Sequence, residues 1–250
     1  MKNQTMKKLI LIISIAAIAI SSQAQKMDFW LDTGFKVQTG ASLFYNSAIA
    51  DDDNWDFTFA TSTKIGGKLG INWNYTGISF DVMVGKTKGL FQNNSTLDAP
   101  DQQISMSTVD LYVLFRDARQ RGYFEIGPRV SIVGDVKNDP VGAASETIVN
   151  SDYYNSTPLA AVLGFGTYVL GSEGRFSGIL GLRFEYGFSN IVSDAGSSVE
   201  RLPTDRQPVN YSGDPSSTTP IFAGLVFELN WGIGGVGQAR CGEKSKFIFF

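Results

Sequence analysis

The stretch Phe57–Tyr75, FTFATSTKIGGKLGINWNY, decides the fold, because large apolar and polar side chains alternate along most of it. One side carries the apolar residues Phe57, Phe59, Ile65, Leu69, Ile71, Trp73 and Tyr75. The other side carries Thr58, Ser62, Lys64, Lys68 and Asn72. A repeat of two residues predicts a β-strand, since successive side chains of a strand point to opposite faces. Gly66, Gly67 and Gly70 lie inside this pattern, where glycine indicates a bend or a close backbone approach rather than a nucleotide-binding loop.

The same alternation recurs in seven other segments, and no long segment after residue 24 has helical periodicity. These segments span residues 29–45, 78–85, 109–116, 124–136, 159–169, 176–188 and 221–231. Several reach the length of about ten residues that a tilted strand needs to cross a bilayer, whereas strands of soluble sheets are nearer five or six. Eight strands are therefore predicted. Ten are disfavoured, because no loop contains a further alternating run of that length.

The connections between the segments alternate strictly between short and long. The short ones fall at residues 74–77, 117–122 and 171–174, and the long ones at 46–56, 87–102, 137–156 and 190–218. Membrane barrels have short turns at the periplasmic end and long loops at the extracellular end. The sequence therefore predicts an all-β fold, a closed antiparallel up-and-down transmembrane β-barrel. An even number of strands places both termini in the periplasm.

The two faces of the segments differ in polarity, because one is made of large apolar residues and the other carries charges of both signs. The acids of the second face are Asp32, Asp81, Asp110, Glu125, Glu185 and Glu228. Its bases are Lys36, Lys64, Lys68, Arg129 and Arg183. An eight-stranded barrel is only just wide enough for side chains, so the large apolar residues would overfill it. We expect the apolar face to contact lipid and the charged residues to pair inside the lumen; the alternative is a solvated, charged exterior.

Aromatic residues gather near the ends of the segments, which is typical of the girdles that membrane barrels place at both lipid–water interfaces. The predicted periplasmic girdle comprises Trp30, Trp73, Tyr75, Phe176 and Trp231, with Phe29, Tyr123 and Phe124 beside them. The predicted outer girdle comprises Tyr45, Phe57, Phe59, Tyr186, Phe188 and Phe222.

The first 24 residues have the composition of a cleaved secretory signal peptide. The positive region carries Lys2, Lys7 and Lys8, and an apolar run follows at residues 9–20. Ser22 and Ala24 supply the small residues that signal peptidase needs. The apolar run is too short for a transmembrane helix, which needs about 20 residues.

Cleavage would leave a barrel domain over residues 25–233 and a C-terminal tail over residues 234–250. Removal of the three lysines lowers the 21 basic residues to 18 against 24 acidic ones, a net charge of −6. This charge argues against nucleic acid as a partner. The single cysteine, Cys241, cannot form an intramolecular disulfide.

The chain contains no histidine, which excludes His-dependent catalysis and His-ligated metal sites. A catalytic Ser/Lys or paired-carboxylate site would not need histidine, but no spacing of these residues in the sequence indicates one. The acidic run Asp51–Asp53 could collect a divalent cation or bridge one to lipopolysaccharide phosphates, yet its spacing departs from the EF-hand pattern. We therefore expect a solvated loop there, no metal site, no cofactor and no enzymatic activity.

With these features the chain resembles the small bacterial outer-membrane β-barrel families: the OmpA transmembrane domain, the OmpX and OmpW types, and the PorT-like barrel domains of Bacteroidetes. The Ala-Gln ending of the signal also resembles signal peptides of that phylum. The resemblance covers the mature chain to about Trp231 and rests on pattern rather than on a sharp motif. It departs at the C-terminus, where the last strand is expected to end near Trp231 or Ile233, before a tail that finishes at Phe250.

The resemblance implies a location in the outer membrane, surrounded by outer-membrane lipid and lipopolysaccharide, and folding by the barrel-assembly machinery. The functional hypothesis is a non-enzymatic outer-membrane barrel with a side-chain-filled lumen, in a structural or envelope-complex role. The alternatives are a small porin-like channel or carrier and a soluble periplasmic lipid-binding barrel. An envelope enzyme is disfavoured, because the barrel enzymes of known families rely on histidine.

Overall fold

The computed structural model describes residues 29–50, 55–94, 100–119, 122–141, 147–149, 151–171, 176–197, 217–237 and 246–249. The elements are β1 (Phe29–Tyr45), α2 (Ser47–Ala50), β2 (Trp55–Thr58), β3 (Ala60–Trp73), β4 (Thr76–Asn93), β5 (Gln102–Arg119), β6 (Gly122–Pro140), β7 (Thr147–Val149), η1 (Ser151–Tyr153), β8 (Leu159–Leu170), β9 (Phe176–Gly187), α3 (Asp194–Ser197), β10 (Thr219–Gly237) and β11 (Lys246–Phe249). The predicted signal peptide, the acidic run Asp51–Asp53 and Cys241 lie outside the described residues. Among the described residues, no helix is long and apolar enough to cross a bilayer.

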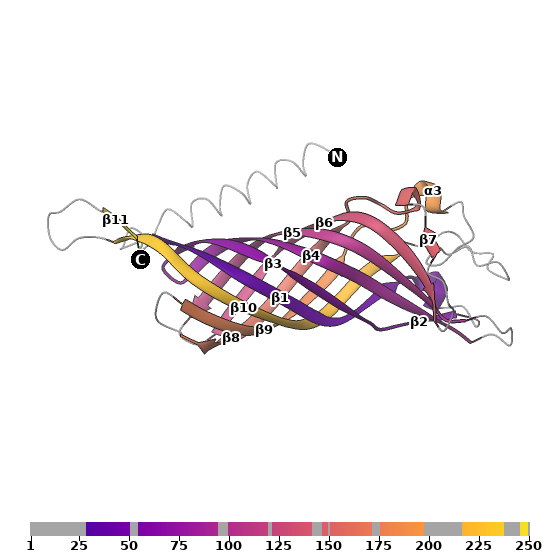
Figure 1. Ribbon diagram of the computed structural model, residues 1–250, viewed down its shortest axis with the longest axis horizontal. Coiled ribbons are helices and arrows are strands. Elements are labelled where there is room, and N and C mark those ends of the chain that lie inside the picture. The colour runs from indigo at the N-terminus through magenta and orange to yellow at the C-terminus, as the bar shows by residue number, and fades with distance from the viewer. Residues whose placement is uncertain are drawn as a thin grey trace, which may run out of the picture.

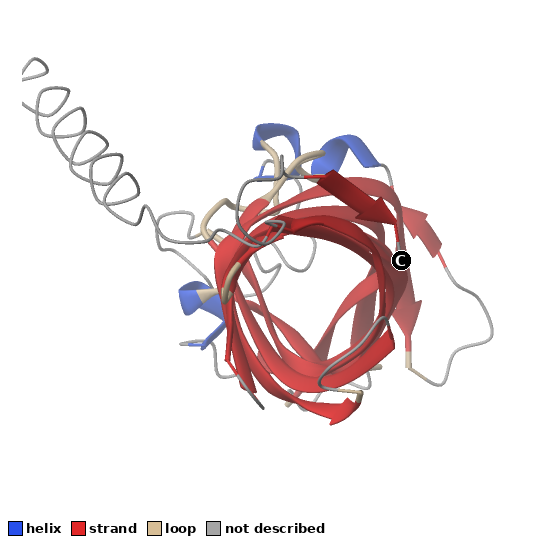
Figure 2. Cartoon of the chain, turned by 90° about the vertical axis from the view of Figure 1, so that its left-hand side faces the viewer, coloured by secondary structure: helices blue, strands red, loops and turns tan. Residues whose placement is uncertain are grey.

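Eight antiparallel strands form a closed ring in the order β1–β3–β4–β5–β6–β8–β9–β10, and β10 pairs with β1 to close it (Figures 1 and 2). Each strand pairs with the ring strand that follows it in sequence, as in an up-and-down barrel. The short strands β2, β7 and β11 pair with β4, β6 and β10 and lie off the ring. The predicted all-β fold with an eight-stranded closed barrel is therefore confirmed.

The pairing register shows how the ring closes. One row of directly paired residues passes through Trp30, Asn72, Gly77, Arg116, Glu125, Gly164, Arg183 and Gly224, and returns to β1 at Gly40. The return point lies further along β1 than the starting point. The strands are therefore staggered and tilted against the barrel axis, as closure of a sheet requires.

The two ends of the barrel differ in the length of their connections, and Figure 1 shows α3 and β7 at one end and β11 at the other. At the short-turn end, β3 and β4 are joined by Asn74 and Tyr75 alone. Asn74 has a φ of 56°, a conformation that asparagine tolerates better than most residues. The opposite end, called here the long-loop end, carries α2, β7, η1 and α3.

The wall of the barrel is apolar outside and charged inside. Large apolar side chains on the outer face are about half exposed, as Leu111 (40%), Leu182 (41%) and Phe80 (44%) illustrate. The charged side chains of Lys36 and Glu228 on the inner face are fully buried. This distribution is the reverse of that in a soluble barrel.

Strands continue further toward the long-loop end than the sequence predicts. Residues 87–102 were expected to form a loop, but β4 runs to Asn93 and β5 begins at Gln102; β6 likewise runs to Pro140, into the expected loop 137–156. The alternation persists there with its sign reversed. Phe91 and Ile104 are fully buried in the interior, whereas Gln92 is exposed. The sequence prediction ended these strands too early, because it required the apolar residues to lie on the outer face.

A β-bulge in β6 accounts for a second difference. Val136 was expected on the apolar outer face and Asp135 on the charged inner face, but Val136 is buried and Asp135 is exposed. The register between β5 and β6 shifts between Met106 and Thr108, where β6 carries one residue more than its partner. Such an extra residue exchanges the two faces of the strand.

Two residues of the predicted outer girdle also face inward. Phe222 is 5% exposed, and Phe57 packs against a buried apolar cluster at the long-loop end. The pairing with β4 is interrupted from Phe59 to Ser62, and Phe59 is outward and 65% exposed. The backbone of Lys88 compensates, because its amide donates to Ser62 Oγ (3.0 Å) and its carbonyl accepts a hydrogen bond from Ser42 Oγ (2.6 Å).

Glycines on the inner face make room for the large side chains of the lumen. A Cβ at Gly181 would lie 2.2 Å from Tyr123 Oη, and Tyr123 is itself confined under the guanidinium of Arg116, 4.6 Å above its ring. On the outer face, a Cβ at Gly67 would meet nothing nearer than the carbonyl oxygen of Gly34, at 3.4 Å.

We predict that Gly181→Ala lowers the free energy of unfolding by about 1 to 3 kcal/mol, because the added methyl group overpacks the lumen. Urea unfolding in detergent micelles measures the effect. Gly67→Ala is the matched control and should change stability little. Tyr123→Phe removes the atom that the methyl group meets, so Gly181→Ala should cost less in that background. Equal losses for Gly181→Ala and Gly67→Ala would contradict the packing argument.

Candidate functional site

The candidate site is the interior of the barrel, where the described part of the chain places acids and bases in equal number. The six acids are Asp32, Asp81, Asp110, Glu125, Glu185 and Glu228, and the six bases are Lys36, Lys64, Lys68, Arg116, Arg129 and Arg183. Asp32 is the most open of these side chains, at 15% exposed. The sequence prediction places eleven of these residues inside and omits Arg116, which brings the charges into balance.

Nearest the short-turn end, Glu228 collects three bases. Arg116 donates to both of its carboxylate oxygens (2.7 and 2.8 Å), and Lys68 lies 2.8 Å and Lys36 3.0 Å from them. Lys68 also contacts Asp32, at 3.1 Å. These residues come from β1, β3, β5 and β10, so the contacts tie four strands of the ring together across its interior.

At mid-height, Arg183 is the centre of the network. Its Nε and Nη2 donate to Glu125 Oε1 at 3.0 and 2.5 Å, and Nη2 lies 3.5 Å from Asp81. Its Nη1 donates to Gln38 Oε1 at 3.1 Å, and the guanidinium lies 5.0 Å from the centre of the Tyr112 ring. The side chain is fully buried, so every charge on it must be compensated by the protein.

Toward the long-loop end, Glu185 accepts hydrogen bonds from three side chains. Tyr112 Oη donates at 3.0 Å, Gln38 Nε2 donates at 2.8 Å, and Arg129 completes the set. Lys64 pairs with Asp110 in the same part of the lumen. Tyr112 and Gln38 are uncharged and were not expected at the site, yet both bind two members of the ionic network.

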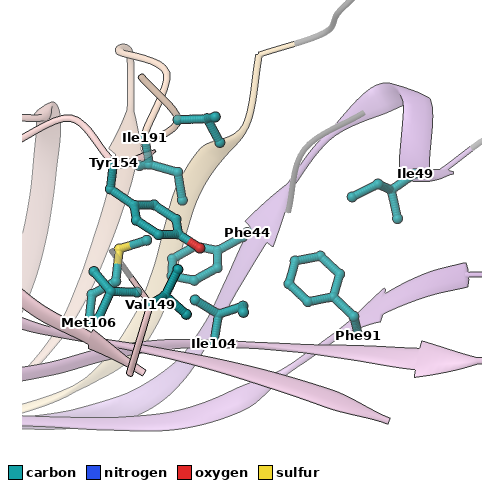
Figure 3. Packing of buried hydrophobic residues seen from close by; sticks show 10 residues of the cluster. Phe44, Ile49, Phe91, Ile104, Met106, Val149, Tyr154 and Ile191 are labelled. Carbon is teal, nitrogen blue, oxygen red and sulfur yellow. The ribbon is translucent and has the colours of Figure 1, made fainter. Parts of the chain in front are cut away.

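An apolar cluster, called here the apolar cap, packs at the long-loop end of the barrel (Figure 3). Its members are Phe44, Ile49, Phe91, Ile104, Met106, Val136, Val149, Tyr154, Ile191 and Val192. Five of them extend from the barrel strands, and the other five come from α2, β7 and the segments around η1 and α3. The long connections were expected to be loops, but their described parts supply half of the cluster.

Hydrogen bonds hold the cap segments together. Asn190 Oδ1 accepts from the backbone amides of Val192 (3.1 Å) and Thr218 (2.9 Å), and Asn155 Nδ2 donates to the carbonyl of Asn190 (2.5 Å). Asn46 Nδ2 donates to Thr218 Oγ1 at 2.8 Å, which joins the end of β1 to the start of β10. The cap is therefore a folded layer over the ionic lumen.

The acids and bases of the network are paired with one another. Each of the six acids contacts at least one of the six bases. Desolvation of a charge costs several kcal/mol, which only close pairing and additional hydrogen bonds recover. Among the residues that the structure describes, no group of three or more His, Cys, Asp or Glu side chains is placed to hold a metal ion.

Three aromatic residues of the predicted periplasmic girdle are exposed at the short-turn end, whereas Tyr123, which was expected beside them, is 4% exposed in the lumen. Phe176 and Trp231 are 41% and 47% exposed, and their rings lie 5.1 Å apart. Tyr75 is 57% exposed in the turn between β3 and β4. Trp30 differs from the others, because it pairs with Asn72 in the row of inner-face residues.

The chain is similar to several solved structures, three of which are described below, while no family model and no curated protein matches it. Neisserial surface protein A has a TM-score of 0.40 at 11% identity, over 80% of this chain and 95% of that one. Ail, the attachment invasion locus protein of Yersinia pestis, solved with the heparin analogue sucrose octasulfate, has a TM-score of 0.35 at 12% identity, over 80% and 99%. The translocator domain of the autotransporter NalP from Neisseria meningitidis has a TM-score of 0.26 at 9% identity, over 92% and 97%.

We predict that Arg183→Ala destabilises the barrel by about 3 to 5 kcal/mol, because it leaves the buried carboxylate of Glu125 without its nearest base. The free energy of unfolding in urea measures the loss. The control is Arg119→Ala, which removes a base from the exposed pair with Asp117 and should have little effect. A similar loss in both variants would show that the lumen network adds no stability.

Proposed function

We propose that this protein is an integral barrel of the bacterial outer membrane with a structural or envelope-complex role. Its lumen is filled by side chains and does not form a pore. The observation that carries the proposal is the reversed polarity of the wall. Half-exposed Leu, Val, Ile and Phe side chains cover its outside, and six acids, five of them buried, face six buried bases inside.

The outer face supports a lipid environment. Soluble monomers rarely expose contiguous apolar patches above a few hundred Å², because such patches drive association. Here the outward side chains of Phe35, Ile65, Phe80, Leu111 and Leu182, from five strands of the ring, are each at least 40% exposed. In the hydrocarbon region of a bilayer, these apolar side chains can be exposed without a cost in free energy. The periplasmic lipid-binding alternative requires an apolar interior, which the charged lumen does not provide.

The interior supports a closed barrel rather than a channel. Arg183, Tyr112 and Lys36 are among the largest fully buried side chains of the chain, and all three lie in the lumen. A passing ion would have to displace their partners and then cross the apolar cap. Both barriers stand in the same path, so steady conduction is not expected.

We predict that spin labels at Leu111 and Leu182 are quenched by a membrane-dissolved quencher, because both positions lie on the outer face of mid-strand. The measurement is the collision rate in reconstituted vesicles. A label at Gln92, exposed near the end of β4, is the matched control and should respond to an aqueous quencher. Aqueous quenching at Leu111 and Leu182 would exclude the membrane assignment.

We also predict that the purified protein is silent in planar bilayers, because ion pairs and the apolar cap block the lumen in series. Recordings are made after flotation has established that the protein is inserted. Discrete, steady openings at the single-molecule level would favour the small channel or carrier and contradict the filled lumen.

A further inference from the structure

The outer face changes from apolar to polar within one step along the strands near the long-loop end. One row of directly paired outward residues consists of Val37, Ile65, Val84, Val109 and Ile132. The next outward row consists of Thr39, Thr63, Lys86 and Ser107. All side chains of the first row are apolar and β-branched, and all of the second can donate hydrogen bonds.

A second polar row follows directly. Lys88 pairs with Ser105 on β5, and Ser105 pairs with Lys137 on β6. The name threonine–lysine patch is used here for Thr39, Thr63, Lys86, Lys88 and Lys137. Thr39 and Thr63 are exposed and hydrogen-bonded to each other across the strands (Oγ1–Oγ1, 3.0 Å).

Positive charge is concentrated at this patch. The other described basic residues of the ring strands are the six of the lumen and Arg119 at the short-turn end. The nearest acids on the strands are Asp135, exposed on the bulge of β6, and Asp139, which lies on the same face of β6 as Lys137. Within the described residues, no salt bridge links Lys86 or Lys88 to an acid. Elsewhere around the rim the outer face remains apolar, as at Leu159, Tyr186 and Phe188.

We propose that the threonine–lysine patch binds the phosphate groups of a phosphorylated glycolipid in the outer leaflet. This inference rests on the proposed membrane location, because only then does the apolar row mark the edge of the hydrocarbon. Lysine stems lie along apolar surface while their ammonium groups reach the interface. Ammonium and hydroxyl donors at that height match the acceptor oxygens of a lipid phosphate, and basic clusters beside membrane spans attract anionic headgroups.

The patch also fits a lipid by its position. Acyl chains of a lipid whose phosphates contact Lys86 and Lys88 would lie along the row of Val37, Ile65 and Val84 directly below. A soluble phosphate would gain nothing from that apolar row. The proposed ligand is therefore a phosphate carried by a lipid rather than the free anion.

The test uses the double variant Lys86→Gln/Lys88→Gln, which keeps a polar side chain at each position and removes both charges. Binding to bisphosphorylated lipid A and to enzymatically dephosphorylated lipid A is measured by native mass spectrometry of the full-length protein in detergent. We expect the variant to bind the phosphorylated lipid at least about tenfold more weakly, from the contribution of each lysine at a lipid surface. Binding of the dephosphorylated lipid should be weak and unchanged.

Arg119→Gln is the matched control, since it removes an exposed base at the opposite end and should leave lipid binding unaltered. Inorganic phosphate should bind neither form measurably; tight binding of it would overturn the choice of a lipid. Equal affinity of wild type and double variant for the phosphorylated lipid would overturn the patch as its site. Quenching at Leu111 is measured on the same variant, so a loss of membrane insertion, which would count against the proposed function, is distinguished from a loss of phosphate binding.

Discussion

The lumen of this barrel has to be electrically neutral and full, and the rest of the structure depends on that constraint. Successive side chains of a strand point to opposite faces, so an apolar outer wall assigns the remaining residues to the interior. An eight-stranded ring leaves space for little more than those side chains. Six acids and six bases occupy it, and charges removed from water persist only when they are paired. Ring closure brings partners from non-adjacent strands, such as Arg116 and Glu228, within 2.7 Å.

Glycines leave room for these long side chains inside the barrel. The row that closes the ring places Gly164 between Glu125 and Arg183, and a Cβ there would lie 2.7 Å from Glu125 Cγ. At the short-turn end a Cβ at Gly70 would meet Asp32 Oδ1 at 1.8 Å. Many of the 27 glycines of the chain therefore matter because they have no side chain. A closely packed, charged interior needs such small residues beside large ones.

Sequence alone predicts the ring and much of the lumen, because period-two alternation fixes both strand and face where one side is uniformly apolar. Lys64 and Lys68 on β3 could be placed inward for that reason. Arg116 stands on the same face as Asp110 and could have been included by that signal. Asp135 and Val136 could not be placed, since the bulge that exchanges them depends on the partner strand. Phe91 and Ile104 were missed because apolar residues turn inward beyond the apolar belt.

That reversal explains how one strand serves two surroundings. On β4, Val82 and Val84 face outward where Asp81 is buried, and further along Lys86 and Gln92 face outward where Phe91 is buried. The pairing of β4 with β5 continues across the boundary, whereas its pairing with β3 ends at Lys86, opposite Thr63. Below the boundary the interior is held by ion pairs because the exterior is apolar. Above it Lys86 and Gln92 are the exposed residues of β4, and the interior becomes an apolar core that the cap segments cover. The position of the apolar cap thus follows from where the outer surface of β4 changes polarity.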